Sequence, residues 1–122
     1  MLQKLGGFDI AAMAGTFLGG ALYGVPILID GFISSVAALL AVRLCPASAC
    51  CMVASHASAE PAASLVLQAL GLTPLISAGM RLGEGTGAVA ALPLLDLAAA
   101  VYREMITFRD LSPEAFPTGR QV

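Results

Sequence analysis

Runs of apolar residues alternate with short breaks rich in glycine, serine and proline along most of the chain. The first run covers residues 8–22, where Met13 and Phe17 stand at helical spacing, and Gly24 follows it. This pattern predicts a helix that ends at a glycine. Residues 25–30 are then apolar or β-favouring and close on a carboxylate followed by a glycine, which predicts a short buried parallel strand.

Helix-type and strand-type segments continue to alternate after residue 30. Glycine and proline mark most of the boundaries, because glycine often ends a helix and proline cannot donate a main-chain hydrogen bond. We therefore expect a helix from Ser34 or Ser35 to about Leu44, a strand over residues 52–56, and a helix from Ser58 or Ala59 to Leu70 that Gly71 ends. A short third strand or an extended piece is expected over residues 74–76, and a helix from about Gly87 to Phe108 with a bend near Pro93.

This order predicts an α/β fold, in which helices cover a layered parallel sheet through right-handed crossovers. Residues 1–108 are expected to form one domain and residues 109–122 an irregular tail. Since ligands of such sheets bind at the carboxyl ends of the strands, we expect Asp30, His56 and Glu84 along one rim. Asp30 and His56 also have structural interpretations, as the cap of the next helix and as a hydrogen-bonded core residue.

Residues 80–88 are the most informative part of the chain, because they place Glu84 between three glycines directly ahead of an apolar helix. Glycine permits positive φ and lets a ligand approach the main chain. Thr86 or Gly87 is expected to cap the helix and leave free N–H groups at the positive end of its dipole. The local pattern fits a flexible loop with a solvated glutamate equally well.

Composition restricts the classes of function. Hydrophobic residues make up 58% of the 122 residues and charged ones 11%, with a net charge of −2, so the chain is embedded in a membrane or packed against more protein. The six basic residues are scattered and form no basic face, which argues against a nucleic-acid partner.

Two uncharged stretches, residues 10–29 and 61–80, are long enough to span a membrane. Both are interrupted by glycine and proline and lean on alanine, and the chain has no tryptophan, so we favour a protein without a membrane span. No apolar core of a signal peptide follows Lys4, and we expect a cytoplasmic location. A small integral membrane protein remains an alternative.

Three cysteines lie close together, at Cys45, Cys50 and Cys51, but their spacing forms no CxxC pair. His56 is the only histidine, and it completes a zinc site only if all three thiols converge. We interpret the cysteines as small buried or loop residues in a reducing cytosol and expect neither a metal nor a cofactor.

Four motifs, in order and at matching separations, resemble the C-terminal part of the nicotinate-nucleotide–dimethylbenzimidazole phosphoribosyltransferase family of cobalamin synthesis. They are LGGFDIAAMAG at residues 5–15, DGFI at 30–33, SHASAEP at 55–61 and RLGEGTGA at 81–88. The resemblance covers residues 5 to about 108 and about the last third of the family's length, in which the fold is Rossmann-like. Ala57 replaces a common arginine, and Ala62 with Ala63 replaces the usual glycine and histidine.

The resemblance implies transfer of phosphoribosyl from nicotinate mononucleotide to 5,6-dimethylbenzimidazole by a homodimer. Glu84 matches the family's catalytic glutamate, and a carboxylate held in an apolar pocket is basic enough to accept the proton of the attacking ring. The other residues expected to bind substrate are Leu82 against the flat base, and Ser58 with the backbone around Gly83 and Gly85 at the ribose or phosphate oxygens. His56, Asp30 and Gly31 are also expected to bind substrate.

Because the family's upstream loops are absent from this sequence, we expect slow turnover or none from the 122 residues alone. A non-catalytic remnant or assembly module with the same fold is the alternative. With 14 charged residues the chain should expose an apolar patch, and we expect it to dimerise or aggregate.

Overall fold

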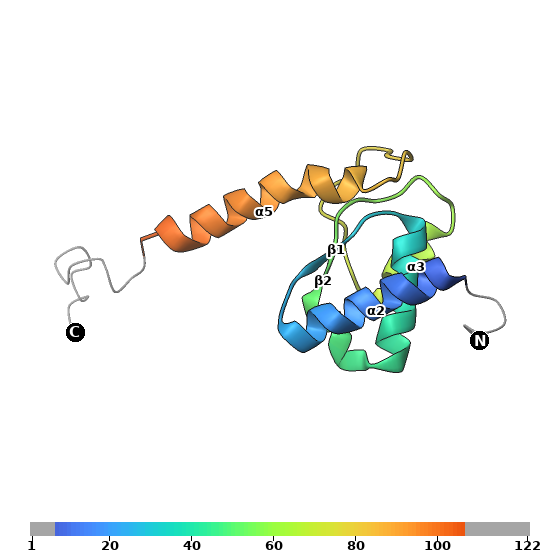
Figure 1. Cartoon of the computed structure of the whole chain (residues 1–122). Coiled ribbons are helices and arrows are strands. Elements are labelled where there is room, and N and C mark those ends of the chain that lie inside the picture. The colour runs from blue at the N-terminus through green and yellow to red at the C-terminus, as the bar shows by residue number, and fades with distance from the viewer. Residues whose placement is uncertain (1–6, 107–122) are drawn as a thin grey trace, which may run out of the picture. The chain divides into compact units, whose positions relative to one another are not determined.

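The structure, a computed structural model, describes residues 7–106, and its helices and strands alternate in the predicted order (Figure 1). All four predicted helices and the first two predicted strands are present, with shifted ends. The elements are helix α2 (Phe8–Tyr23), strand β1 (Ile27–Ile29), helix α3 (Phe32–Leu44), the 3-10 helix η1 (Pro46–Cys51), strand β2 (Met52–Ala54), helix α4 (Ala63–Leu70) and helix α5 (Thr86–Glu104).

Two predicted helix ends are confirmed and two predicted starts, those of α3 and α4, are wrong. Helices α2 and α4 end at Gly24 and Gly71, where φ is 67° and 69°. Helix α3 begins at Phe32, before the predicted serines, because Ser34 lies in its first turn. There the Ser34 hydroxyl accepts a hydrogen bond from Gly31 N (3.0 Å) and donates one to the Gly31 carbonyl (2.9 Å).

Helix α4 begins at Ala63, later than predicted from Ser58 or Ala59. The ring of Pro61 disfavours helical geometry at the residue before it, which is Glu60. The Glu60 N–H instead donates to the Ser58 hydroxyl at 3.3 Å. The segment before α4 is therefore a turn, and it leaves Ser58 and Glu60 on a loop.

Strands β1 and β2 pair in parallel, so their carboxyl ends meet at one edge, with Ile27, Leu28 and Ile29 opposite Met52, Val53 and Ala54. Of the two alternatives for residues 74–76, the third strand does not form and the extended piece is observed: Ile76 makes only an isolated parallel bridge with His56. Pro74 has no N–H to continue the ladder. The sheet of residues 7–106 therefore has two strands.

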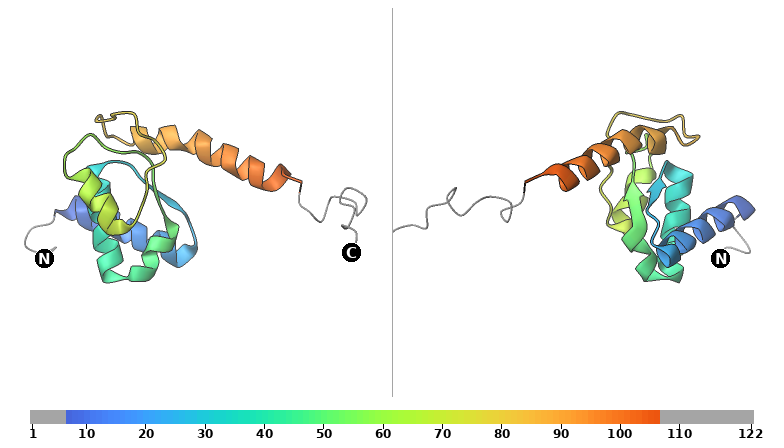
Figure 2. Two further views of the ribbon diagram at one scale, coloured as in Figure 1. Left: turned by 180° about the vertical axis from the view of Figure 1, so that it is seen from behind. Right: turned by 60° about the vertical axis from the view of Figure 1, so that its left-hand side comes forward.

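Helices α2 and α3 pack together on one side of the two strands (Figure 2). Four of the seven residues of their shared core are alanines, whose small side chains let the helix backbones approach closely. The shared core consists of Ala14, Phe17, Ile29, Ala37, Ala38, Ala41 and Met52. This core fixes the carboxyl ends of β1 and β2 relative to the first turns of α2 and α3.

The chain divides into two compact units, residues 1–92 and 93–122, and the division falls within α5 at Pro93. The predicted tail and the boundary after residue 108 lie outside the described residues, but the expected helix end at Phe108 is wrong, because residues 105 and 106 are not helical. Helix α5 ends at Glu104.

One described helix, α5, is long and apolar enough to cross a membrane by length and composition. It is neither of the two uncharged stretches considered from the sequence. Residues 10–29 contain most of α2 and then β1, and residues 61–80 contain α4 and the irregular segment after it. Neither stretch forms a continuous helix of membrane-spanning length.

Candidate functional site

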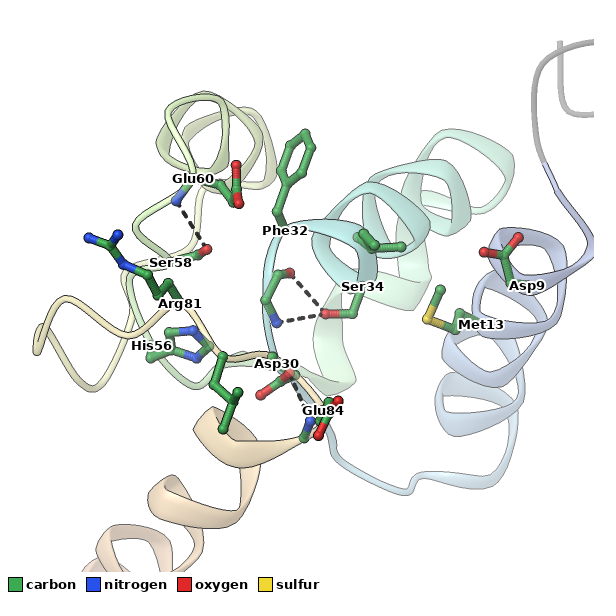
Figure 3. Close-up of a pocket in the computed structure, with 15 residues that line it drawn as sticks. Asp9, Met13, Asp30, Phe32, Ser34, His56, Ser58, Glu60, Arg81 and Glu84 are labelled. Atoms are coloured by element: carbon green, nitrogen blue, oxygen red, sulfur yellow. Dashed lines mark hydrogen bonds between the residues drawn. The ribbon is translucent and has the colours of Figure 1, made fainter.

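A cavity of about 820 Å³ opens at the carboxyl ends of β1 and β2, within the unit of residues 1–92 (Figure 3). Its lining comes from the first turns of α2 and α3, the segments after both strands, and the loop before α5. The lining residues are Asp9, Met13, Asp30, Gly31, Phe32, Ile33, Ser34, His56, Ser58, Glu60, Arg81, Leu82, Gly83, Glu84 and Gly85.

Asp30 follows β1 directly, and its carboxylate holds the start of α5. One oxygen accepts a hydrogen bond from Gly85 N and the other from Ala88 N, each at 3.0 Å. Asp30 therefore caps a helix, as one interpretation expected, but the helix is α5 and not α3. Because this carboxylate already satisfies two N–H groups at the positive end of α5, it takes the place that an anionic ligand would occupy there.

The expected cap by Thr86 or Gly87 is wrong, because Thr86 closes the preceding turn. Its N–H donates to the Gly83 carbonyl at 3.0 Å and its hydroxyl donates to the same oxygen at 2.7 Å. Gly83, Glu84 and Gly85 have φ of 76°, 56° and 80°. Positive φ at both central residues is typical of the mirror-image turns, which glycine forms without steric cost.

Glu84 is the one residue other than glycine with positive φ among residues 7–106. For an L-residue this conformation costs about 1–2 kcal/mol, because Cβ approaches the following carbonyl oxygen. Strained residues of this kind concentrate at functional sites, where the surrounding structure enforces them. The expected desolvation is not met within this chain, since Glu84 is exposed.

His56 is buried, with 4% of its surface exposed. Its Nδ1 lies 3.1 Å from the Ser55 hydroxyl oxygen. The first turn of α5 passes directly against the imidazole ring, so that a Cβ on Gly87 would overlap the ring. Only glycine fits at residue 87 without displacing His56 or α5, which explains the third glycine of the run.

All eight residues expected to form the site line this one cavity, and the expected rim is confirmed for Asp30, His56 and Glu84. Their exposures differ widely. Leu82 is 71% exposed, whereas His56 is nearly enclosed.

Sequence reasoning did not assign seven lining residues: Asp9, Met13, Phe32, Ile33, Ser34, Glu60 and Arg81. Asp9 carried a signal, since an acidic residue in the first turn of a largely apolar helix marks its polar end. The charged lining comprises four carboxylates and one guanidinium, and Figure 3 shows Arg81 with Glu60 on the side away from Asp9. This excess of acceptors favours ligand groups that donate hydrogen bonds.

The three cysteines lie away from the cavity and are not buried: Cys45 and Cys50 are exposed and Cys51 is half-buried. The Sγ atoms of Cys50 and Cys51 are 3.5 Å apart, and this hydrogen bond raises the pKa of the Cys51 thiol. Among residues 7–106 no three side chains of His, Cys, Asp or Glu converge as a metal site would require.

A family model described as Phosphoribosyltransferase matches residues 1–112. Nicotinate-nucleotide–dimethylbenzimidazole phosphoribosyltransferase of Clostridium acetobutylicum is 49% identical over 116 residues, which cover 95% of this chain and 33% of the relative. The protein of that name from Azotobacter vinelandii is 53% identical over 110 residues, covering 90% and 31%.

A crystal structure of the enzyme of that name from Thermus thermophilus matches with a TM-score of 0.83 at 42% identity. The match covers 89% of this chain and 33% of that one. The α/β architecture expected from the sequence agrees with this neighbour. This chain spans about a third of the length of the relatives it matches.

Proposed function

We propose, because this chain belongs to the nicotinate-nucleotide–dimethylbenzimidazole phosphoribosyltransferase family, that it carries the benzimidazole-binding part of a phosphoribosyl-transfer site. The donor would be nicotinate mononucleotide and the acceptor 5,6-dimethylbenzimidazole. Since the chain spans about a third of its relatives' length, the remaining two thirds would supply the rest of the site. Alone, the chain would turn over slowly or not at all, because the rate depends on holding both substrates in reacting geometry.

The observation that carries the proposal is the strained turn that holds Glu84 at the cavity mouth. Glu84 has positive φ between two glycines of positive φ, and this conformation destabilises the fold. Its carboxylate makes no hydrogen bond within residues 7–106 that would offset the strain. A role toward a ligand accounts for it. The cavity, at about 820 Å³, is in the range that small-molecule sites occupy.

In the proposed reaction a benzimidazole nitrogen attacks the anomeric carbon of the ribose phosphate. The bond from that carbon to the nicotinate nitrogen breaks, and nicotinate leaves. The other benzimidazole nitrogen loses its proton as positive charge builds on the ring, and the Glu84 carboxylate accepts it. Leu82 offers apolar surface to the flat rings, and Gly83 and Gly85 leave the main chain open to them.

The charge of the cavity supports assigning the benzimidazole, and not the phosphate, to this part of the site. Four carboxylates and one guanidinium line it, so a phosphate group would meet net repulsion in this part of the site. The hydroxyl of Ser58 and the polar groups of Asp30 and Gly31 would contact the ribose. The two thirds of the family's length that this sequence does not cover would then hold the phosphate. This fits the presence of alanine at residues 57 and 63, where arginine and histidine are common in the family.

The exposed apolar side chains support association with further protein. Phe8 is 97% exposed, Tyr23 80% and Leu22 76%, all on α2. Burying such side chains stabilises a complex by about 1.5–3 kcal/mol each. We propose that the rest of the family's chain and a second copy, as a homodimer, cover these residues, and that the protein acts in the cytoplasm.

The test combines this chain with the preceding two thirds of the Clostridium acetobutylicum relative and measures nicotinate release from the mononucleotide in the presence of dimethylbenzimidazole. Glu84→Gln keeps the size of the side chain and removes proton acceptance, so the rate should fall by about 10²–10⁴. Asp96→Asn makes the same chemical change at an exposed position outside the cavity lining and should leave the rate unchanged.

A Glu84→Gln rate within a few-fold of the wild type would show that Glu84 is not the base. If this chain and the added two thirds of the relative are folded and associated but release no nicotinate, the alternative of a non-catalytic assembly module is favoured. The exposed position of Glu84 agrees with that alternative. The family match argues against the membrane alternative, because it includes all of α5, the helix that is long and apolar enough to span a membrane.

A further inference from the structure

His56 is the one ionisable side chain that is buried among residues 7–106, and the structure fixes which of its ring nitrogens carries the proton. The neighbouring residue, Ser55, has a fully buried hydroxyl. The hydroxyl oxygen lies 2.6 Å from the Ile29 carbonyl oxygen, 3.2 Å from the Asp30 carbonyl oxygen and 3.1 Å from His56 Nδ1.

A hydroxyl has one proton to donate. Two oxygens only 2.6 Å apart require a proton between them, so the Ser55 proton points at Ile29. The hydroxyl can therefore only accept at its contact with His56, and Nδ1 must be the donor. A neutral ring that carries its proton on Nδ1 has a bare lone pair on Nε2.

The other ring nitrogen, Nε2, belongs to a side chain that lines the cavity. Among residues 7–106 Nε2 has no protein partner, and every fully enclosed side-chain nitrogen or oxygen of these residues has a hydrogen-bond partner. Nε2 is therefore not fully enclosed, and the cavity that His56 lines is the space available to a partner. A nearly buried polar atom without a partner, on a side chain that lines a cavity, is a position for a ligand group.

We propose that His56 is locked as its Nδ1–H tautomer by Ser55 and presents Nε2 as an acceptor for a ribose hydroxyl of the substrate. The ligand assignment rests on the proposed function, whereas the tautomer does not. A bare phosphate oxygen would be repelled by the lone pair. The benzimidazole has one N–H, which the proposed reaction directs to Glu84, so the ribose hydroxyls are the donors that remain.

Because His56 is the only histidine, its ring nitrogens can be assigned without ambiguity from long-range ¹⁵N–¹H correlations of the ligand-free chain at alkaline pH. We expect Nδ1 to resonate as the protonated nitrogen and Nε2 as the unprotonated one. The reverse pattern, or an equal mixture of tautomers, would overturn the proposal without reference to any activity.

Ser55→Ala removes the only acceptor that the structure shows for Nδ1–H, and the spectrum should then move toward the other tautomer. The fold should survive, because the Ile29 carbonyl still accepts from the main-chain N–H of residue 55 at 3.0 Å. Ser48→Ala is the matched control. Its hydroxyl is equally buried and bonded to a main-chain carbonyl, but it lies in η1 and should leave the His56 spectrum unchanged.

Addition of nicotinate mononucleotide should move the Nε2 resonance upfield, as donation to a bare ring nitrogen does, and leave Nδ1 nearly unmoved. His56→Asn, which keeps a side-chain N–H donor but has no counterpart of Nε2, should weaken mononucleotide binding by about 3–10-fold and leave dimethylbenzimidazole binding unchanged.

If dimethylbenzimidazole moves Nε2 and the mononucleotide does not, the acceptor serves the ring N–H and the ribose assignment is wrong. If the mononucleotide binds, as its effect on backbone amides would report, while Nε2 stays unmoved, the acceptor role is wrong. If neither compound binds with the completing two thirds present, the proposed function and the ribose assignment fail together, while the ligand-free spectrum still decides the tautomer.

Discussion

Replacing Glu84 by glycine should stabilise the folded chain and at the same time remove the side chain on which the proposed reaction depends. The reason is the φ of 56° at this residue, which glycine adopts without penalty. Nothing in the described structure opposes the change, since the side chain is exposed and makes no hydrogen bond within residues 7–106. The effect therefore isolates the backbone strain.

The magnitude follows from two opposing terms. Relief of the left-handed conformation contributes about 1–2 kcal/mol. Glycine also gives the unfolded chain more freedom, which returns about 0.4–1 kcal/mol. The net stabilisation is about 0.5–1 kcal/mol, and for a domain of this size the melting temperature should rise by about 2–8 °C.

Thermal unfolding followed by circular dichroism measures the effect in the 122-residue chain. Glu84→Gln removes the charge and keeps the Cβ, so it should leave the melting temperature unchanged. Glu84→Asn should fall between the two, because asparagine tolerates the left-handed region better than most residues. A lower melting temperature for Glu84→Gly than for Glu84→Gln would refute the idea that residue 84 is strained.

Two further results are expected. Asp30→Ala should remove both hydrogen bonds that hold the start of α5. The Gly85 and Ala88 amides should then exchange with solvent at least tenfold faster, which corresponds to about 1.4 kcal/mol or more of lost protection. Unchanged exchange would contradict the capping role. Phe17→Ala should destabilise the chain by about 3–5 kcal/mol in urea unfolding because Phe17 is 4% exposed, whereas Phe8→Ala, at 97% exposure, should change stability by less than about 0.5 kcal/mol; equal effects would show that the α2 core is misplaced.

Local chemistry made much of the fold predictable. Gly24 and Gly71 end their helices because glycine adopts the required conformation, and this depends only on neighbours in sequence. Short segments of the sequence likewise predict the alternation of helices and strands, and the parallel pairing follows from that alternation. The start of α4 was missed although its cause, Pro61, is also local.

The parts of the site that could not be predicted depend on long-range contacts. Asp30 bonds to amides 55 and 58 residues further along the chain, and no local pattern distinguishes this cap from one on the next helix. The exposure of Glu84 was missed for a different reason. Apolar residues near it in sequence indicated an apolar environment, but side chains such as Leu82 are themselves exposed in this chain.

The positive φ at Glu84 also favours one particular mutation of its codon, the change to glycine. Both glutamate codons become glycine codons by a single transition at the second base, and glycine is the residue that the turn prefers. In a gene copy released from selection for activity, that one-base change removes strain and meets no opposition from folding. We therefore expect glycine at this position to mark idle copies, whereas glutamate in an active lineage is held by purifying selection against the preference of the backbone.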